Sequence, residues 1–109
     1  MDVSLPLLSS VAHVATGSAE RYMVQLCRHF AHRLPVTQVG SGGRIEFPAG
    51  VCLLDTATTA GTLIITVNTR DEDSLPQLED VVARHLARFA FRETLDIVWS
   101  RRGDAEVWY

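Results

Sequence analysis

Apolar residues recur along this chain in two different rhythms. Between residues 19 and 34 they are spaced three and four apart, which is typical of a helix with one buried face. The members of this stripe are Ala19, Met23, Leu26, Cys27, Phe30 and Leu34. Thr16 and Ser18 supply hydroxyls suited to a helix start, and Pro35 disfavours helical backbone at the residue before it. We therefore predict a helix over Ala19–Leu34.

A second helical stripe follows the acidic run at residues 71–73. Its apolar members are Leu75, Leu78, Val82, Leu86 and Phe89. Ser74 and Gln77 have the spacing of a capping box, and Pro76 stands where its missing N–H costs little. The pattern predicts a helix that begins at Ser74.

The other rhythm is an alternation of apolar and polar residues, which is typical of strands. It predicts strands at residues 10–16, 36–39, 44–47, 51–56, 62–68 and 95–100, separated by glycine- and proline-containing turns. Alternation implies one packed sheet face and one that faces water. The predicted fold is therefore α+β, a two-layer sandwich with two helices on one face of a mostly antiparallel sheet. The predicted order is strand, helix, four strands, helix, strand.

Length and composition narrow the class of protein. A chain of 109 residues with 47% hydrophobic and 21% charged residues fits one globular domain, with residues 1–9 and 103–109 as terminal extensions. No apolar run approaches the ~20 residues that cross a bilayer, and the start of the chain lacks the basic region of a signal peptide. We expect no membrane contact.

Charge and cysteine usage add two further expectations. The net charge of −3 and the scattered arginines argue against nucleic-acid binding, which needs a basic face. Cys27 and Cys52 are too few for a disulfide framework, and both fall in apolar patterns. Buried free thiols in a reducing compartment indicate a cytoplasmic protein.

The best candidate for chemistry is the segment from Cys27 to His32. His29 and His32 are three apart and so occupy neighbouring positions on a helix surface. Such a pair can hold one metal ion, or act as one acid and one anion contact. Cys27 points to the opposite side of the helix, so a soft thiolate site is not expected. The alternative is that both histidines are merely exposed.

His85 is a third candidate, at the edge of the second apolar stripe. It is either a hydrogen-bonded core residue or, if the helices lie side by side, a neighbour of His29 or Tyr22. Tyr22, Arg28 and Arg84 complete the set of candidate residues. No phosphate-binding loop, paired CxxC motif or nucleophile elbow accompanies them.

Several segments together resemble a known bacterial family. They are residues 21–32, Arg44 to Pro48, Leu78 to Leu86 and Arg88 to Arg92, and the likeness covers roughly residues 11 to 102. The chain resembles the uncharacterised family named domain of unknown function 2218, whose His-Phe-x-His and Arg-His-Leu segments match residues 29–32 and 84–86. Similar domains are attached to siderophore-interacting flavin reductases, so the resemblance implies a context of iron metabolism.

Three functional hypotheses remain open. The first is a metal- or iron-handling accessory protein in which His29, His32 and His85 bind Fe, Zn or Cu. The second is a non-enzymatic interaction module that docks a flavin-dependent siderophore reductase or a second copy of itself. It would use a sheet face with Arg44, Glu46, Thr66 and Asp96, or the tail at residues 107–109. The third, ranked last, is a small enzyme with His29 or His85 as acid or base.

Overall fold

The computed structural model describes residues 8–101, and its elements follow the predicted order. The strands are β1 (Leu8–Ala15), β2 (Val36–Val39), β3 (Gly42–Phe47), β4 (Gly50–Asp55), β5 (Thr62–Thr69) and β6 (Ser100–Arg101). The helices are α1 (Ala19–Phe30), which follows β1, and α2 (Ser74–Phe89), which follows β5. The α+β architecture predicted from the alternating patterns is confirmed.

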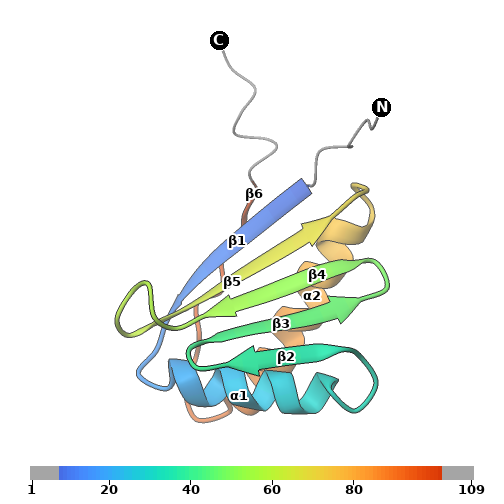
Figure 1. Cartoon of the computed structure of the whole chain (residues 1–109). Coiled ribbons are helices and arrows are strands. Elements are labelled where there is room, and N and C mark those ends of the chain that lie inside the picture. The colour runs from blue at the N-terminus through green and yellow to red at the C-terminus, as the bar shows by residue number, and fades with distance from the viewer. Residues whose placement is uncertain (1–7, 102–109) are drawn as a thin grey trace.

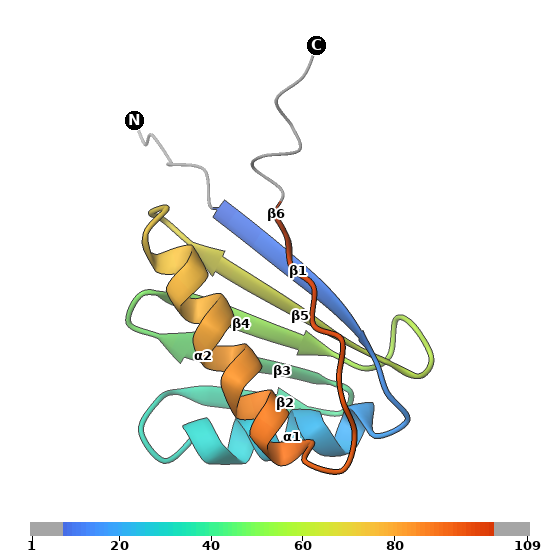
Figure 2. The ribbon, with the colours of Figure 1, turned by 180° about the vertical axis from the view of Figure 1, so that it is seen from behind.

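All the strands belong to one antiparallel sheet in the order β2-β3-β4-β5-β1-β6 (Figure 1). Both helices lie on the same face of this sheet, as the view from behind shows (Figure 2). In the described part of the chain, the other face carries no helix. Neither helix within residues 8–101 is long and apolar enough to cross a bilayer.

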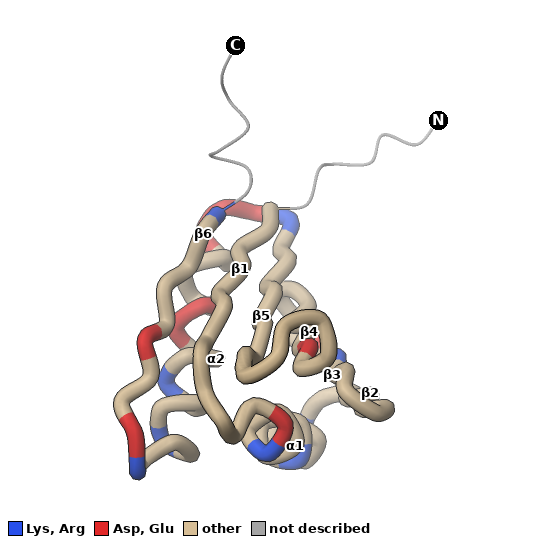
Figure 3. Tube along the Cα trace, turned by 90° about the vertical axis from the view of Figure 1, so that its left-hand side faces the viewer, with Lys and Arg blue, Asp and Glu red and all other residues tan. Residues whose placement is uncertain are grey.

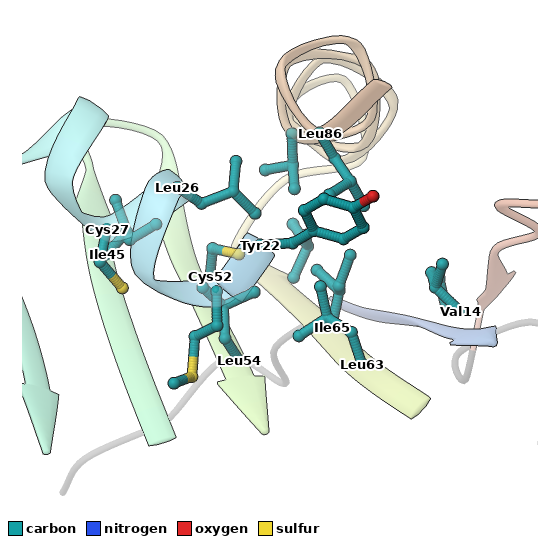
Figure 4. Close-up of a cluster of buried hydrophobic side chains, with 14 of the residues drawn as sticks. Val14, Tyr22, Leu26, Cys27, Ile45, Cys52, Leu54, Leu63, Ile65 and Leu86 are labelled. Carbon is teal, nitrogen blue, oxygen red and sulfur yellow. The ribbon is translucent and has the colours of Figure 1, made fainter. Parts of the chain in front are cut away.

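The core lies between the sheet and the helix layer. In β5 the inward side chains are Leu63, Ile65 and Val67, all fully buried, and they alternate with partly exposed residues as predicted. The two helices contribute Met23, Leu26, Val82 and Leu86 to the same cluster, part of which Figure 4 shows. Cys27 and Cys52 are free and buried in it, and burial raises the pKa of the Cys52 thiol to about 12.

The first helix is shorter than predicted. It ends at Phe30 rather than Leu34, and the Arg33 N–H bonds to the carbonyl three residues back, at Phe30, as in a 3₁₀ turn; the Leu34 N–H shares this carbonyl. The chain tightens into a turn there, ahead of Pro35. As a result His29 lies in the last helical turn, whereas His32 lies outside the helix.

The helix starts also differ in detail from the prediction. The capping box expected at Ser74 does not form; instead the Asp71 carboxylate accepts from the Ser74 backbone N–H at 2.8 Å and from its hydroxyl at 3.1 Å. The first strand begins at Leu8, two residues earlier than predicted, so part of the expected 1–9 extension belongs to the sheet.

The strand predicted at residues 95–100 is wrong for most of its length. Only Ser100 and Arg101 pair with β1, while residues 95–99 form no regular structure. The alternation does indicate which side chains face the core, because Leu95, Ile97 and Trp99 are partly buried against it. The segment runs from the end of α2 back to the β1 edge and pairs with β1 only at its end (Figure 2). Asp96 therefore lies outside the sheet, and the expected extension at 103–109, with its apolar tail, lies beyond the described residues.

A salt bridge fastens β6 to α2. The Glu79 carboxylate accepts two hydrogen bonds from the Arg101 guanidinium, at 2.8 and 3.1 Å, and the Glu79 side chain is only 10% exposed. Burial alone would raise the pKa of Glu79, but the hydrogen bonds and charge of Arg101 outweigh it and hold this pKa below its usual range.

We expect Glu79→Gln to lower the free energy of unfolding by about 1 kcal/mol at pH 7, since Arg101 is partly solvated. A carboxyl whose folded pKa is depressed stabilises the fold above its unfolded pKa of about 4.3, and that stability is lost as the pH falls further. The gap between wild type and variant in urea denaturation should therefore narrow as the pH falls below about 4.3 and vanish once the folded-state carboxyl is protonated. Glu46→Gln, in a half-exposed pair with Arg44 at 3.5 Å, is the control and should change little. A gap for Glu79→Gln that stays constant or widens as the pH falls would contradict this assignment.

Candidate functional site

Two of the three candidate histidines meet where the helices lie side by side. His29 stands in the last turn of α1 and His85 in the third quarter of α2. Their ring centroids are 4.8 Å apart with the rings tilted by 43°. Residues 56 positions apart in the chain thus form one imidazole pair, which we call the His29–His85 pair.

Phenylalanine rings hold the His29–His85 pair in place. The Phe30 ring lies 5.0 Å from the His29 ring and 4.9 Å from the His85 ring, so it contacts both imidazoles. The Phe89 ring lies 5.7 Å from the His29 ring, and Phe47 of β3 packs on Phe30 at 5.1 Å. Edge-to-face contacts at these distances are favourable and fix the ring orientations.

The hydrogen bonding of His85 leaves one ring nitrogen with a lone pair. Its Nδ1 lies 2.7 Å from the Val81 carbonyl oxygen, which can only accept, so Nδ1 carries the proton. In the neutral ring Nε2 is then unprotonated. A backbone carbonyl that fixes the tautomer in this way is the usual support of a metal-binding or proton-accepting histidine.

The surroundings of His29 favour its neutral form. Loss of hydration lowers the pKa of His29, and the positive charges of neighbouring groups lower it further. Those neighbours are His85, His32 and Arg88. This lowered pKa favours the neutral His29 imidazole, which offers a lone pair to an electrophile.

His32 lies near the pair but outside it. It is exposed, and with His29 it lines a mostly apolar hollow of about 420 Å³ whose walls also include Phe30 and Leu34. Within residues 8–101 no group of three or more His, Cys, Asp or Glu side chains is arranged to hold a metal ion. The groups with lone pairs at this position are thus the two imidazoles, with His32 lining the hollow beside His29.

The remaining candidate residues lie elsewhere. Tyr22 is buried, and its hydroxyl donates a short hydrogen bond to the Glu93 carboxylate, which is the main cause of its raised pKa. Thr16 donates to the same carboxylate at 3.1 Å, so this cluster ties the chain after α2 to α1. Glu93 was missed in the sequence because nothing in its irregular surroundings singles it out.

Arg84 and Arg28 do not join the pair either. Arg84 donates to Asp80 one turn earlier at 2.8 Å on the exposed side of α2. Arg28 lines a groove between α1 and β2. A larger hollow of about 560 Å³ lies beside Arg44 and Arg70. Arg44 and Glu46 of the predicted interaction face line it, and the candidate histidines do not.

The fold and this site define a small α+β sandwich with an imidazole pair between its helices. The model of one protein family, described as an uncharacterized protein conserved in bacteria (domain of unknown function 2218), matches residues 11–100. The chain belongs to this family. It is similar in structure to PA4090 from Pseudomonas aeruginosa, solved by NMR, with a TM-score of 0.71 and 38% identity over 85% of this chain and 95% of that one. No curated protein matches the chain.

Proposed function

We propose that this protein is a metal-handling accessory protein that binds a transition-metal ion, free or within a small chelate, through His29 and His85. The observation that carries the proposal is the 4.8 Å approach of the two imidazole rings. Metal–nitrogen bonds are about 2.0–2.1 Å long, so two rings this close can reach one ion. The likeness to a family found beside siderophore-interacting reductases favours a role in iron metabolism.

The donor set suits an imidazole-binding ion such as Fe, Zn or Cu rather than a hard cation, which prefers oxygen ligands. Both thiols are buried in the core and the Cys52 thiol has a raised pKa, which does not favour a thiolate site. Because the pair supplies only two nitrogens, the remaining coordination positions would belong to His32, to water or to the donor atoms of a carried chelator. Such an open coordination sphere fits transfer of a metal better than permanent storage. The buried free thiols support the cytoplasm as the site of action.

Titration calorimetry of the tag-free protein with Zn(II), Cu(II) and Fe(II) tests the proposal. His29→Ala and His85→Ala should each weaken binding at least about tenfold, since each removes one of two protein ligands. His32→Ala should have a smaller effect. His13→Ala is the matched control, because His13 is exposed on the helix-free face of the sheet, and it should bind like wild type.

Binding should also depend on pH. A protonated imidazole cannot ligate, so affinity should fall below about pH 6, where histidine gains a proton. Equal heats for wild type, His29→Ala and His85→Ala at pH 7.5 would remove the proposal.

A second candidate function is a docking module for a partner such as a flavin-dependent siderophore reductase. The helix-free sheet face favours it, because that face exposes Leu53 and, at its edge, Val39, which is 75% exposed. Apolar residues gathered on an open sheet face are a common feature of protein interfaces. If no metal binds to the wild-type protein, this is the function to pursue. An acid–base role for the same imidazoles is the remaining alternative.

A further inference from the structure

We infer that a hollow between α1 and the chain just after α2 binds a small aromatic carboxylate. The hollow has a volume of about 310 Å³, which is within the range of small-molecule sites. Its walls come from both helices and from the residues that follow α2: Arg21, Tyr22, Gln25, Phe89, Phe91 and Arg92. The site contains neither His29 nor His85 and needs no metal ion.

Hydrogen bonds hold the chain after α2 beside α1. The Glu93 carboxylate accepts a short hydrogen bond from the Tyr22 hydroxyl, although the two residues are 71 positions apart, and a second one from Thr16 at 3.1 Å. Figure 3 looks along α1 and shows the chain from α2 to β6 on the side of α1 opposite β2. Phe91 and Arg92 directly precede Glu93, so these bonds fix the outer wall of the hollow relative to α1.

Two guanidinium groups give the hollow a positive charge. Within residues 8–101 neither Arg21 nor Arg92 forms an ion pair, and no Asp or Glu side chain lines the hollow. Arg21 donates one hydrogen bond, to the Ser18 hydroxyl at 3.2 Å, which leaves other N–H groups for a ligand. The fork of a guanidinium matches the two oxygens of a carboxylate, so we expect an anion here.

Other arginines of the chain lie beside acids. The larger hollow next to Arg44 is also lined by Glu46 and Asp71, and Glu46 pairs with Arg44 at 3.5 Å. The groove that contains Arg28 is lined by Glu20 as well. A carboxylate ligand would meet like charge in both of those places, whereas the hollow at Arg21 and Arg92 has no acidic side chain from residues 8–101 in its walls.

The same hollow has aromatic walls. Phe91 is 78% exposed, and the Arg92 guanidinium lies 5.5 Å from the centroid of its ring. A cation and an aromatic ring are thus presented next to each other, with the half-buried ring of Phe89 in the same wall. An aromatic ligand would remove the apolar surface of these rings from water while its carboxylate contacts the arginines. Inorganic phosphate would use only the arginines, so the walls favour a ligand with a ring.

An NMR titration of the isotope-labelled full chain with sodium benzoate, in the presence of a metal chelator, tests the site. We expect saturable shifts of the Gln25 side-chain amide and of the Phe91 and Arg92 backbone amides, with a dissociation constant of about 1 mM or below. Arg21→Gln and Arg92→Gln should each raise this constant at least about fivefold, because each removes a charged hydrogen-bond donor. Arg84→Gln is the matched control, since it removes the same charge from the exposed side of α2, and it should bind like wild type.

Two further ligands separate the contribution of charge from that of the ring. Benzamide keeps the ring without the charge and should bind at least about tenfold more weakly than benzoate. Inorganic phosphate has the charge without the ring and should also bind more weakly. The inference would be overturned by an absence of saturable shifts at about ten times the expected dissociation constant, by benzamide or phosphate that binds as tightly as benzoate, or by unchanged affinity in folded Arg21→Gln and Arg92→Gln. The spectrum of each variant without ligand shows whether it is folded.

His85→Ala makes the test independent of the proposed metal site. His85 does not line the hollow, so the variant should bind benzoate like wild type even though it has lost half of the His29–His85 pair. Failure of metal binding would therefore leave the carboxylate site standing, and failure of benzoate binding would leave the metal proposal standing. Loss of benzoate binding in a folded His85→Ala would place the ligand at the imidazoles and overturn the assignment to this hollow.

Discussion

Replacing Gly50 by alanine should lower the free energy of unfolding by about 3 kcal/mol or more, one of the largest effects of any single methyl group in this protein. Gly50 is the first residue of β4 and pairs with Thr69 of β5. A Cβ at this position would lie 2.2 Å from the Asn68 carbonyl oxygen, 2.8 Å from a Thr69 methyl group and 3.0 Å from Leu78. The nearest atom is backbone, so relief of the clash would require β4 and β5 to separate where they pair.

Thermal unfolding followed by circular dichroism measures the effect. A loss of about 3 kcal/mol in a domain of this size corresponds to a fall in Tm of at least about 10 °C. Gly17→Ala is the matched control, because a Cβ there meets no atom within 4 Å, and it should change stability by less than about 1 kcal/mol. A Gly50→Ala protein that melts with wild type would show that β4 and β5 are further apart than the structure places them.

The fold could be predicted from the sequence wherever one side of an element is buried. The stripe from Leu75 to Phe89 and the alternation Leu63, Ile65, Val67 each repeat with one period over their whole length, and the structure has those elements. The prediction was wrong where the same apolar spacing has two physical solutions. Leu95, Ile97 and Trp99 alternate like the residues of a strand and pack against the core. The segment that carries them pairs with β1 only from Ser100 onward.

The ends of elements and the site depended on contacts that are not local. The helix boundary at Phe30 is set by two hydrogen bonds to one carbonyl, and its stripe continues through Leu34 beyond that boundary. The spacing on one helix favoured a site of His29 with His32, and His85 was expected beside His29 only if the two helices lie side by side. The structure pairs His29 with His85 across the two helices. Contacts between the two helices depend on how the helices pack on the sheet. The sequence pattern of either helix alone does not predict that packing.

The Phe30 ring contributes both to the stability of the fold and to the geometry of the candidate site. It is 9% exposed, belongs to the core and contacts both imidazoles of the His29–His85 pair as well as Phe47 of the sheet. Phe30→Ala should therefore lower the free energy of unfolding by about 3–4 kcal/mol through lost burial and the cavity left behind. Urea denaturation measures it. Phe91→Ala is the matched control, since Phe91 is 78% exposed, and it should change stability by less than about 0.5 kcal/mol.

Phe30→Leu separates the two roles of this ring. Leucine keeps much of the buried apolar volume but has no ring to orient the imidazoles, so the loss of stability should be near 1 kcal/mol. If the ring positions the His29–His85 pair, the ring NMR signals of both histidines should shift and the lowered pKa of His29 should rise toward 6.5, while the ring signals of His13 stay unchanged. Histidine signals unaffected by Phe30→Leu would mean that the backbone of the two helices alone sets the distance between the imidazoles, because the contact between Phe30 and each ring would then contribute nothing to it.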